Sequence, residues 1–259
     1  MTERAGGFTI VEVLVAMAVM TTSAGVLLSL IVAGQRLARM QPEAADQQQR
    51  ARIAIETLGA ELERAGAGLE RGPRAGPLSR YFAPLTATPD GAVTVWYASP
   101  GGGQAMIARA LPAVATEVLV DSAGACAAPN ETCGFSAGGT AILFDGGGCR
   151  DVARIEDVAP SALVLRANAR GCAYDAGAWI AEGEVRTYRV DAATRQLFRR
   201  DEATGISLPV LDNVASMTSE WSADGRRMRI TLRLSSTLLH MPDLVVALDA
   251  APANLQERW

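Results

Sequence analysis

The chain has 259 residues, a net charge of −4 at neutral pH and 49% hydrophobic residues. This length allows one large domain or two small ones, and the composition allows a sizeable core. All its cationic side chains are arginine and most are scattered, so a mildly acidic chain of this kind has no overall electrostatic attraction to nucleic acid. We therefore predict no nucleic-acid partner.

The N-terminus joins a short polar segment to a long apolar one. Residues 2–7 are polar or small, and Phe8 and Glu12 follow them. From Val13 to Val32 there are 20 residues without a charge. As a helix they measure about 30 Å, the thickness of the hydrocarbon core of a bilayer. We predict a membrane-spanning helix over residues 8–34.

Two simpler interpretations compete with a specialised role for this segment. An ordinary cleaved signal peptide has a shorter apolar region that ends at a small-residue cleavage site. A simple signal anchor leaves Glu12 unexplained, because a carboxylate at the bilayer centre costs about 2.5–3.5 kcal/mol. Glu12 lies only about 6 Å along a helix from Phe8, so the headgroup layer is an alternative place for its side chain.

The segment Gly7-Phe8-Thr9-Ile10-Val11-Glu12 resembles the N-terminal signal of type IV prepilins and pseudopilins. The resemblance implies that a prepilin peptidase cleaves between Gly7 and Phe8, removes residues 1–7 as a leader, and methylates Phe8. It also implies that Glu12 pairs with the N-terminal amine of a neighbouring subunit during assembly. An α-amino group has a pKa of about 7.7–8.0 and is charged at neutral pH, and methylation keeps that charge.

Residues 35–67 are predicted to form an amphipathic helix that packs against the rest of the chain. Their apolar stripe recurs at helical spacing and consists of Ala51, Ile55, Leu58, Leu62 and Ala65. The opposite, polar face is expected to carry Arg50, Glu56, Glu61, Glu63 and Arg64. Pro42 is expected to kink or interrupt the helix between membrane and head.

Two further segments narrow the resemblance. The stretch from Gln47 to Gly66 is similar to the segment that follows the anchor in PilW-like minor pilins and J-type pseudopilins. A weaker match lies at Arg186–Trp221, where a strand, a strand that ends in arginine and a pair of valines follow in the same order as in that group.

Residues 68–259 are predicted to form a β-rich head. Glycines and prolines follow Gly66 and end the helix. Beyond them, short strands alternate with turn residues, and Met228, Ile230, Leu232 and Leu234 alternate with polar residues as in a strand with one buried face. The other expected strands are Val93–Tyr97, Glu117–Val120, Thr140–Phe144, Ala153–Val158, Ala162–Leu165, Gly183–Val190, Gln196–Arg199, Ala215–Trp221 and Leu244–Leu248. The fold class is therefore α+β, with a long N-terminal helix on a mostly antiparallel β head.

The head contains all four cysteines, which favours disulfides in an oxidising compartment over a zinc site, because no C-x-x-C pair occurs. Four cysteines allow three connectivities, and we favour Cys126–Cys133 with Cys149–Cys172. Arginines flank the apolar span on both sides and do not set the topology, so the cysteines place the head outside the cytoplasm.

No catalytic constellation stands out. The single histidine, His240, precedes Met241-Pro242, and a lone histidine there is interpreted as structural. The glycine runs lead to no phosphate-binding motif. The loop from Asp145 to Asp151 is interpreted as a turn, with calcium as an alternative ligand for its carboxylates. We predict no enzyme activity, cofactor, metal or small-molecule substrate.

The resemblance implies a minor pilin of a type IV pilus, active in assembly or initiation and in adhesion, motility or DNA uptake. Its expected partners are other pilins or pseudopilins, the prepilin peptidase and the inner membrane. The head is expected in the periplasm, or outside the cell once assembled. A minor pseudopilin of type II secretion and a signal-anchored periplasmic enzyme or binding protein are the alternatives.

Overall fold

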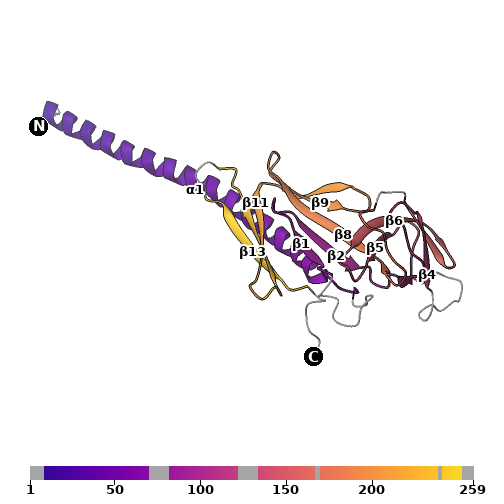
Figure 1. The fold of residues 1–259 in the computed structure, drawn as a ribbon. Helices are drawn as coiled ribbons and strands as arrows, with labels where there is room; N and C mark the ends of the chain where they lie inside the picture. Colours follow the sequence, from indigo (N-terminus) through magenta and orange to yellow (C-terminus); the bar gives the residue numbers. More distant parts are fainter. Residues whose placement is uncertain (1–8, 70–81, 122–133, 167–169, 239–240, 253–259) are drawn as a thin grey trace, which may run out of the picture.

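One long helix and a β-rich head make up the protein. The computed structural model describes residues 9–69, 82–121, 134–166, 170–238 and 241–252. Helix α1 (Ile10–Arg64) projects from the head with its N-terminal half and lies against strands with its C-terminal half (Figure 1). All pairings between the described strands are antiparallel. The α+β prediction is confirmed.

Helix α1 is continuous through Pro42, so the predicted interruption is wrong. Proline removes one helical hydrogen bond, from its own missing N–H to the carbonyl of Ala38. The surrounding residues are good helix formers such as Ala, Gln, Glu and Arg. The turns on both sides therefore continue the helix, and the apolar span and the head share one rod.

The strands follow α1 in short lengths. Their bounds are β1 (Leu85–Ala87), β2 (Val93–Ala98), β3 (Gln104–Ile107), β4 (Glu117–Asp121), β5 (Thr140–Phe144), β6 (Arg150–Ala159), β7 (Ala162–Leu165), β8 (Trp179–Asp191), β9 (Gln196–Asp201), β10 (Ser207–Leu211), β11 (Val214–Trp221), β12 (Met228–Leu234) and β13 (Leu244–Ala250). The expected alternation along β12 is confirmed, because Met228, Ile230, Leu232 and Leu234 are all buried.

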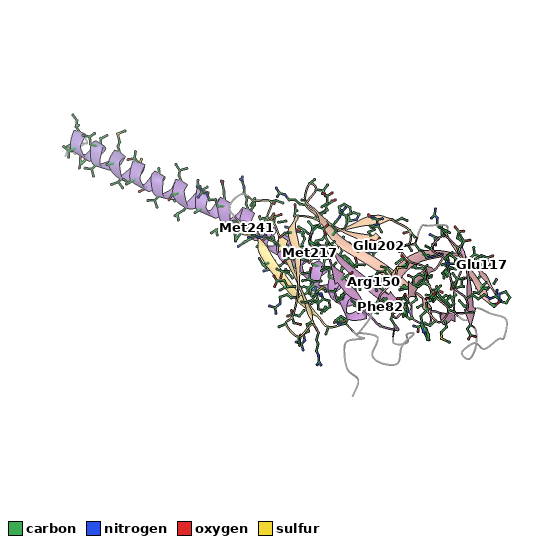
Figure 2. The ribbon with its side chains drawn as sticks, viewed as in Figure 1. Phe82, Glu117, Arg150, Glu202, Met217 and Met241 are labelled. Atoms are coloured by element: carbon green, nitrogen blue, oxygen red, sulfur yellow. A yellow bond between two sulfur atoms is a disulfide. The ribbon has the colours of Figure 1, made fainter. Side chains whose placement is uncertain are left out.

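The part of the head farthest from the protruding helix is a closed β-barrel. Strands β3, β4, β7, β6 and β5 pair in that order, and the first half of β8 pairs with both β3 and β5 to close the ring. Glu117 on β4 lies toward this far end (Figure 2). The interior contains buried apolar side chains from all six strands, among them Ile107, Val118, Leu143, Ile155, Leu163 and Ile180.

The Cys149–Cys172 disulfide joins the start of β6 to the segment before β8, with the two Cα atoms 6.2 Å apart. This is the pairing expected from the sequence. The carboxylate of Asp151 accepts hydrogen bonds from the N–H groups of Gly171 and Cys172 and from the Tyr174 hydroxyl. The disulfide and Asp151 therefore hold the same segment to β6. Cys126 and Cys133 lie outside the described residues.

Two sheets enclose the C-terminal half of α1. One contains β2, the second half of β8 and β9, and the other is the three-stranded sheet β11–β12–β13. Side chains from both sheets form one core with Ala51, Ala54, Leu58 and Leu62 of the helix. The helix is therefore embedded in the head over this half and lies in the corner between two sheets.

Gly183 marks the point where β8 leaves the barrel and joins the sheet beside the helix. Residues 179–182 pair with β3 and β5, whereas residues 183–188 pair with β2. A Cβ atom at Gly183 would lie 2.3 Å from the carbonyl oxygen of Tyr97 and 2.6 Å from Cδ1 of Ile142. Only glycine allows the two halves of the head to approach this closely.

Candidate functional site: an exposed apolar helix fixed to the head

The protruding half of α1 presents a large apolar surface to its surroundings. Among the described residues, α1 is the helix that is long and apolar enough to cross a membrane, and its apolar window is not buried by the protein. Ile10 is 81% exposed and Met20 is 73% exposed. Monomeric soluble proteins rarely expose a contiguous apolar surface of this kind, so α1 is a candidate membrane anchor or signal segment.

Three hydroxyl side chains within this segment, those of Thr21, Thr22 and Ser29, are satisfied by the helix itself. The hydroxyl of Thr21 donates to the carbonyl of Met17, that of Thr22 to Ala18, and that of Ser29 to Val26. In hydrocarbon an unpaired hydroxyl is costly, because no water is present to replace the missing partner. These internal hydrogen bonds fit the segment to an apolar medium.

Glu12 closes a capping box at the start of the helix. Its carboxylate accepts a hydrogen bond of 2.9 Å from the backbone N–H of Thr9. In return, the backbone N–H of Glu12 donates a hydrogen bond of 3.3 Å to the hydroxyl oxygen of Thr9. These bonds satisfy two of the free N–H groups that begin a helix. Glu12 is exposed and lies near the N-terminal edge of the apolar surface.

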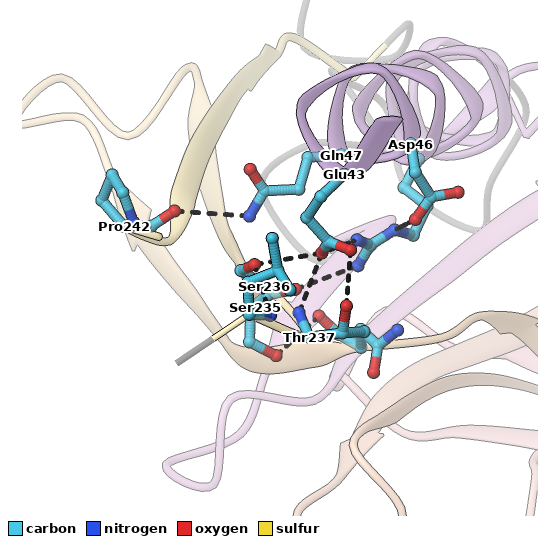
Figure 3. A network of polar contacts seen from close by, with 10 residues as sticks. Glu43, Asp46, Gln47, Ser235, Ser236, Thr237 and Pro242 are labelled. Atoms are coloured by element: carbon cyan, nitrogen blue, oxygen red, sulfur yellow. Dashed lines mark hydrogen bonds and ion pairs between the residues drawn. The ribbon is translucent and has the colours of Figure 1, made fainter. Parts of the chain in front are cut away.

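A polar contact, here called the helix clamp, fixes α1 where it enters the head (Figure 3). On the helix it comprises Glu43, Asp46, Gln47 and Arg50, and on the β12–β13 connection it comprises Ser235, Ser236, Thr237 and Pro242. Met241 lies beside the helix at the same level (Figure 2). The clamp joins residues that are almost 200 positions apart in the sequence.

Arg50 is the centre of the helix clamp. Its side chain is 8% exposed and pairs with Asp46 at 2.8 Å and with Glu43 at 3.4 Å. It also donates to the carbonyl of Ser235 at 3.1 Å. Glu43 accepts from the backbone N–H of Thr237 at 2.8 Å, and hydrogen bonds from Thr237 lower the pKa of Glu43. The charges of Arg50 and Glu43 are thus buried with their partners, whereas the side chain of Asp46 is 57% exposed.

A second polar cluster fixes the C-terminal end of α1. Glu61 accepts a hydrogen bond from the hydroxyl of Tyr97 on β2 and pairs with Arg186 on β8, which also pairs with Glu184. Burial and the neighbouring Glu61 carboxylate raise the pKa of Tyr97, so its phenol stays protonated and keeps donating. Two separate polar contacts therefore hold the same helix and fix its rotation.

The expected polar face of the helix is partly wrong. Arg50 and Glu61, assigned to the solvent side, are buried, and Ile55, assigned to the apolar stripe, is 46% exposed. The reason is that the helix lies in a corner between two sheets, which buries a wider face than one flat contact would. The buried positions are Gln47, Arg50, Ala51, Ala54, Leu58, Glu61, Leu62 and Ala65.

The other site residues expected from the sequence fall in different places. Gly7, Phe8 and His240 lie outside the described residues. Asp145 accepts hydrogen bonds from the backbone N–H groups of Gly147 and Cys149, as in a turn. In the part of the chain that the structure describes, no three metal-ligating side chains are grouped together.

The helix clamp carries a prediction of stability. We expect Arg50→Ala to lower the free energy of unfolding by about 2–3 kcal/mol, because Glu43 and the carbonyl of Ser235 lose a charged donor in a buried setting. Arg52→Ala is the matched control, since the Arg52–Glu56 pair is 77% and 63% exposed and contributes at most about 1 kcal/mol. Urea unfolding of the full chain in detergent micelles, followed by tryptophan fluorescence, compares them. Equal losses in both variants would contradict this role of Arg50.

Comparison with known proteins identified no relative of this chain. No protein-family model, no curated protein and no solved structure matches the chain. The functional argument therefore rests on the chain's own residues and on the sequence motif around Glu12.

Proposed function

We propose that the chain is a minor pilin, a structural subunit of a type IV pilus that takes part in filament assembly. One observation carries this proposal: the exposed apolar half of α1 is continuous with a half that is embedded and clamped in the head. In the assembled filament, the apolar halves pack against one another, and the heads form the outer layer.

The rigid connection separates this proposal from a simple anchor. A signal-anchored enzyme needs only a span and a linker, and a flexible linker leaves the head free to move. Here the helix clamp and the Glu61 cluster fix the orientation of the head relative to the apolar surface. Subunits that pack in register through their helices need such a fixed orientation, because each head must meet its neighbours in one position.

Glu12 supplies the register in this proposal. After cleavage at Gly7, the amine of Phe8 is charged at neutral pH, and Glu12, four residues along the chain, carries the opposite charge. In an apolar bundle an isolated charge is expensive, whereas an amine and a carboxylate from adjacent subunits compensate each other. A subunit displaced along the bundle leaves both charges unpaired.

The localisation follows from the same proposal. The apolar half of α1 crosses the inner membrane once, with the head in the periplasm, where the Cys149–Cys172 disulfide is stable. Assembly then withdraws the helix from the membrane into the filament. A minor pseudopilin of a type II secretion system uses the same geometry and is the second candidate.

The proposal is tested by shearing filaments from cells and probing the sheared and membrane fractions with an antibody against the head. We expect the chain in the sheared fraction, and we expect its loss from that fraction when the major pilin is deleted. If the chain disappears from the sheared fraction only when the major pseudopilin is deleted, the chain belongs to the type II secretion system instead. Retention in the membrane fraction of every strain would contradict both functions.

A further inference from the structure

The head has a pocket on the side of its sheet that faces away from the helix. Its volume is about 260 Å³, and it lies on β8, on β9 with the residue that follows it, and at the start of β10. The lining residues are Thr187, Arg189, Asp191, Phe198, Arg200, Glu202 and Ser207. Neither the core of the head nor the proposed filament role uses these side chains.

Alternation along the strands separates this face from the core. Tyr188 and Leu197 are buried among the residues that contact α1. Their neighbours along the strands therefore point the other way, out of the sheet. Because α1 packs on the inner face, the pocket lies on the face of the sheet that the helix does not cover.

Strand register places an aromatic residue beside two arginines on the same face of the sheet. Phe198 is directly opposite Arg189 on the neighbouring strand, and Arg200 follows Phe198 two residues later on the same face. Thr187 and Ser207 flank Arg200 on the two sides in the same row. The pocket thus offers a flat apolar surface with hydrogen-bond donors around it.

The charges of the pocket balance. Arg200 pairs with Glu202 at 3.6 Å, so this carboxylate already has a cationic partner. Asp191 accepts a hydrogen bond of 2.8 Å from the N–H of Ala193, and this bond is the main reason for its lowered pKa. Among the described residues Arg189 makes no hydrogen bond and no ion pair within 4 Å, although its charge helps to lower the pKa of Asp191 and of Asp90, so its donors are available to a ligand. With two cations and two anions, the site does not select a strongly charged ligand.

We propose that this pocket binds one residue of a neutral oligosaccharide. A pyranose has an apolar face of C–H groups that can stack on Phe198, and its hydroxyls can both donate and accept. They can therefore use the guanidinium groups and the carboxylates at once, which an anionic ligand or an apolar peptide side chain cannot do. The volume is below the roughly 300–1,000 Å³ of pockets for drug-sized ligands, which suits a single sugar residue with its chain continuing into solvent.

Saturation-transfer NMR of the full chain in micelles tests the proposal, with a detergent that carries no sugar headgroup. The probes are cellotriose, maltotriose, chitotriose and mannotriose, with trigalacturonate as the anionic comparison and trialanine as the peptide comparison. We expect at least one neutral trisaccharide to bind more tightly than trigalacturonate and trialanine. Failure of all four neutral sugars, or preference for trigalacturonate or trialanine, would overturn it.

Variants locate the binding. We expect Phe198→Ala and Arg189→Ala each to lower the affinity for the trisaccharide about tenfold, a loss of about 1.4 kcal/mol of binding free energy. Arg109→Ala, an exposed arginine outside the pocket, should bind as the wild type does. Because Arg189 is exposed, its substitution leaves the fold intact. If Phe198→Ala does not fold, Arg189→Ala alone tests whether the sugar binds in this pocket. Unchanged affinity in Arg189→Ala would place the sugar elsewhere and overturn the assignment. The readout is independent of filament assembly, so its failure leaves the proposed function untouched.

Discussion

The Glu12→Ala variant is expected to be cleaved, stable and embedded in the membrane, but absent from sheared filaments. Removing the charge of Glu12 from an apolar helix favours membrane insertion. The gain is at most about 2.5–3.5 kcal/mol, the cost of a carboxylate at the bilayer centre. The head makes no described contact with Glu12, so its fold and its disulfide should persist. Immunoblots of sheared and membrane fractions measure the distribution.

Two further variants separate the charge of Glu12 from its capping role. Glu12→Gln keeps an oxygen that can accept from the N–H of Thr9, but it loses the charge that would pair with an amine. Thr9→Ala removes the hydroxyl of the capping box and keeps the charge. We expect Glu12→Gln to fail in assembly and Thr9→Ala to assemble. The reverse pattern, or normal assembly of Glu12→Ala, would mean that Glu12 only caps the helix or lies among the headgroups.

The Gly7→Val variant is expected to accumulate as the uncleaved precursor. A peptidase that cuts after Gly7 must accommodate a residue without a side chain next to the cut, and a β-branched residue also restricts the backbone there. The uncleaved chain keeps residues 1–7 on the end of α1, so the amine cannot reach the position that pairs with Glu12. The mass of the membrane-extracted protein measures processing.

Ala5→Val is the matched control for Gly7→Val, since it adds the same kind of side chain two residues farther from the cut. We expect this control to mature as the wild type does. Normal maturation of Gly7→Val would reject the cleavage site.

The sequence predicted the elements whose signals are local. The uncharged run from Val13 to Val32 corresponds to the exposed half of α1, and the alternation from Met228 to Leu234 corresponds to β12. The disulfide between Cys149 and Cys172 follows the expected pairing. For the helix and the strand, a short window of residues contains the physical cause.

The helix clamp was missed because its partners are distant in the sequence. Arg50 follows Asp46 by one helical turn and Glu43 by two, a spacing that is also typical of a solvated helix face. Only the β12–β13 connection, with the N–H of Thr237 and the carbonyl of Ser235, buries the charges of Arg50 and Glu43. The available signal was the helical periodicity, which places Gln47, Arg50 and Glu61 on the same face of the helix as the buried apolar residues.

Three strands were missed for local reasons. β1 has only three residues, and β3 directly follows Gly101–Gly103. β10 contains Pro209, which fits an edge strand but weakens a strand signal. Closure of the barrel was not predicted either, because it depends on β8 pairing with β3 and β5 at once, and no local pattern encodes such long-range pairing.

The intact mass of the mature wild-type chain, extracted from membranes, tests the central claim most directly. If the chain is a pilin subunit, the mass equals that of residues 8–259 plus one methyl group, and fragmentation places the methyl group on the amine of Phe8. A chain that still begins at Met1, or that begins at another residue, would contradict the account and favour a simple membrane anchor.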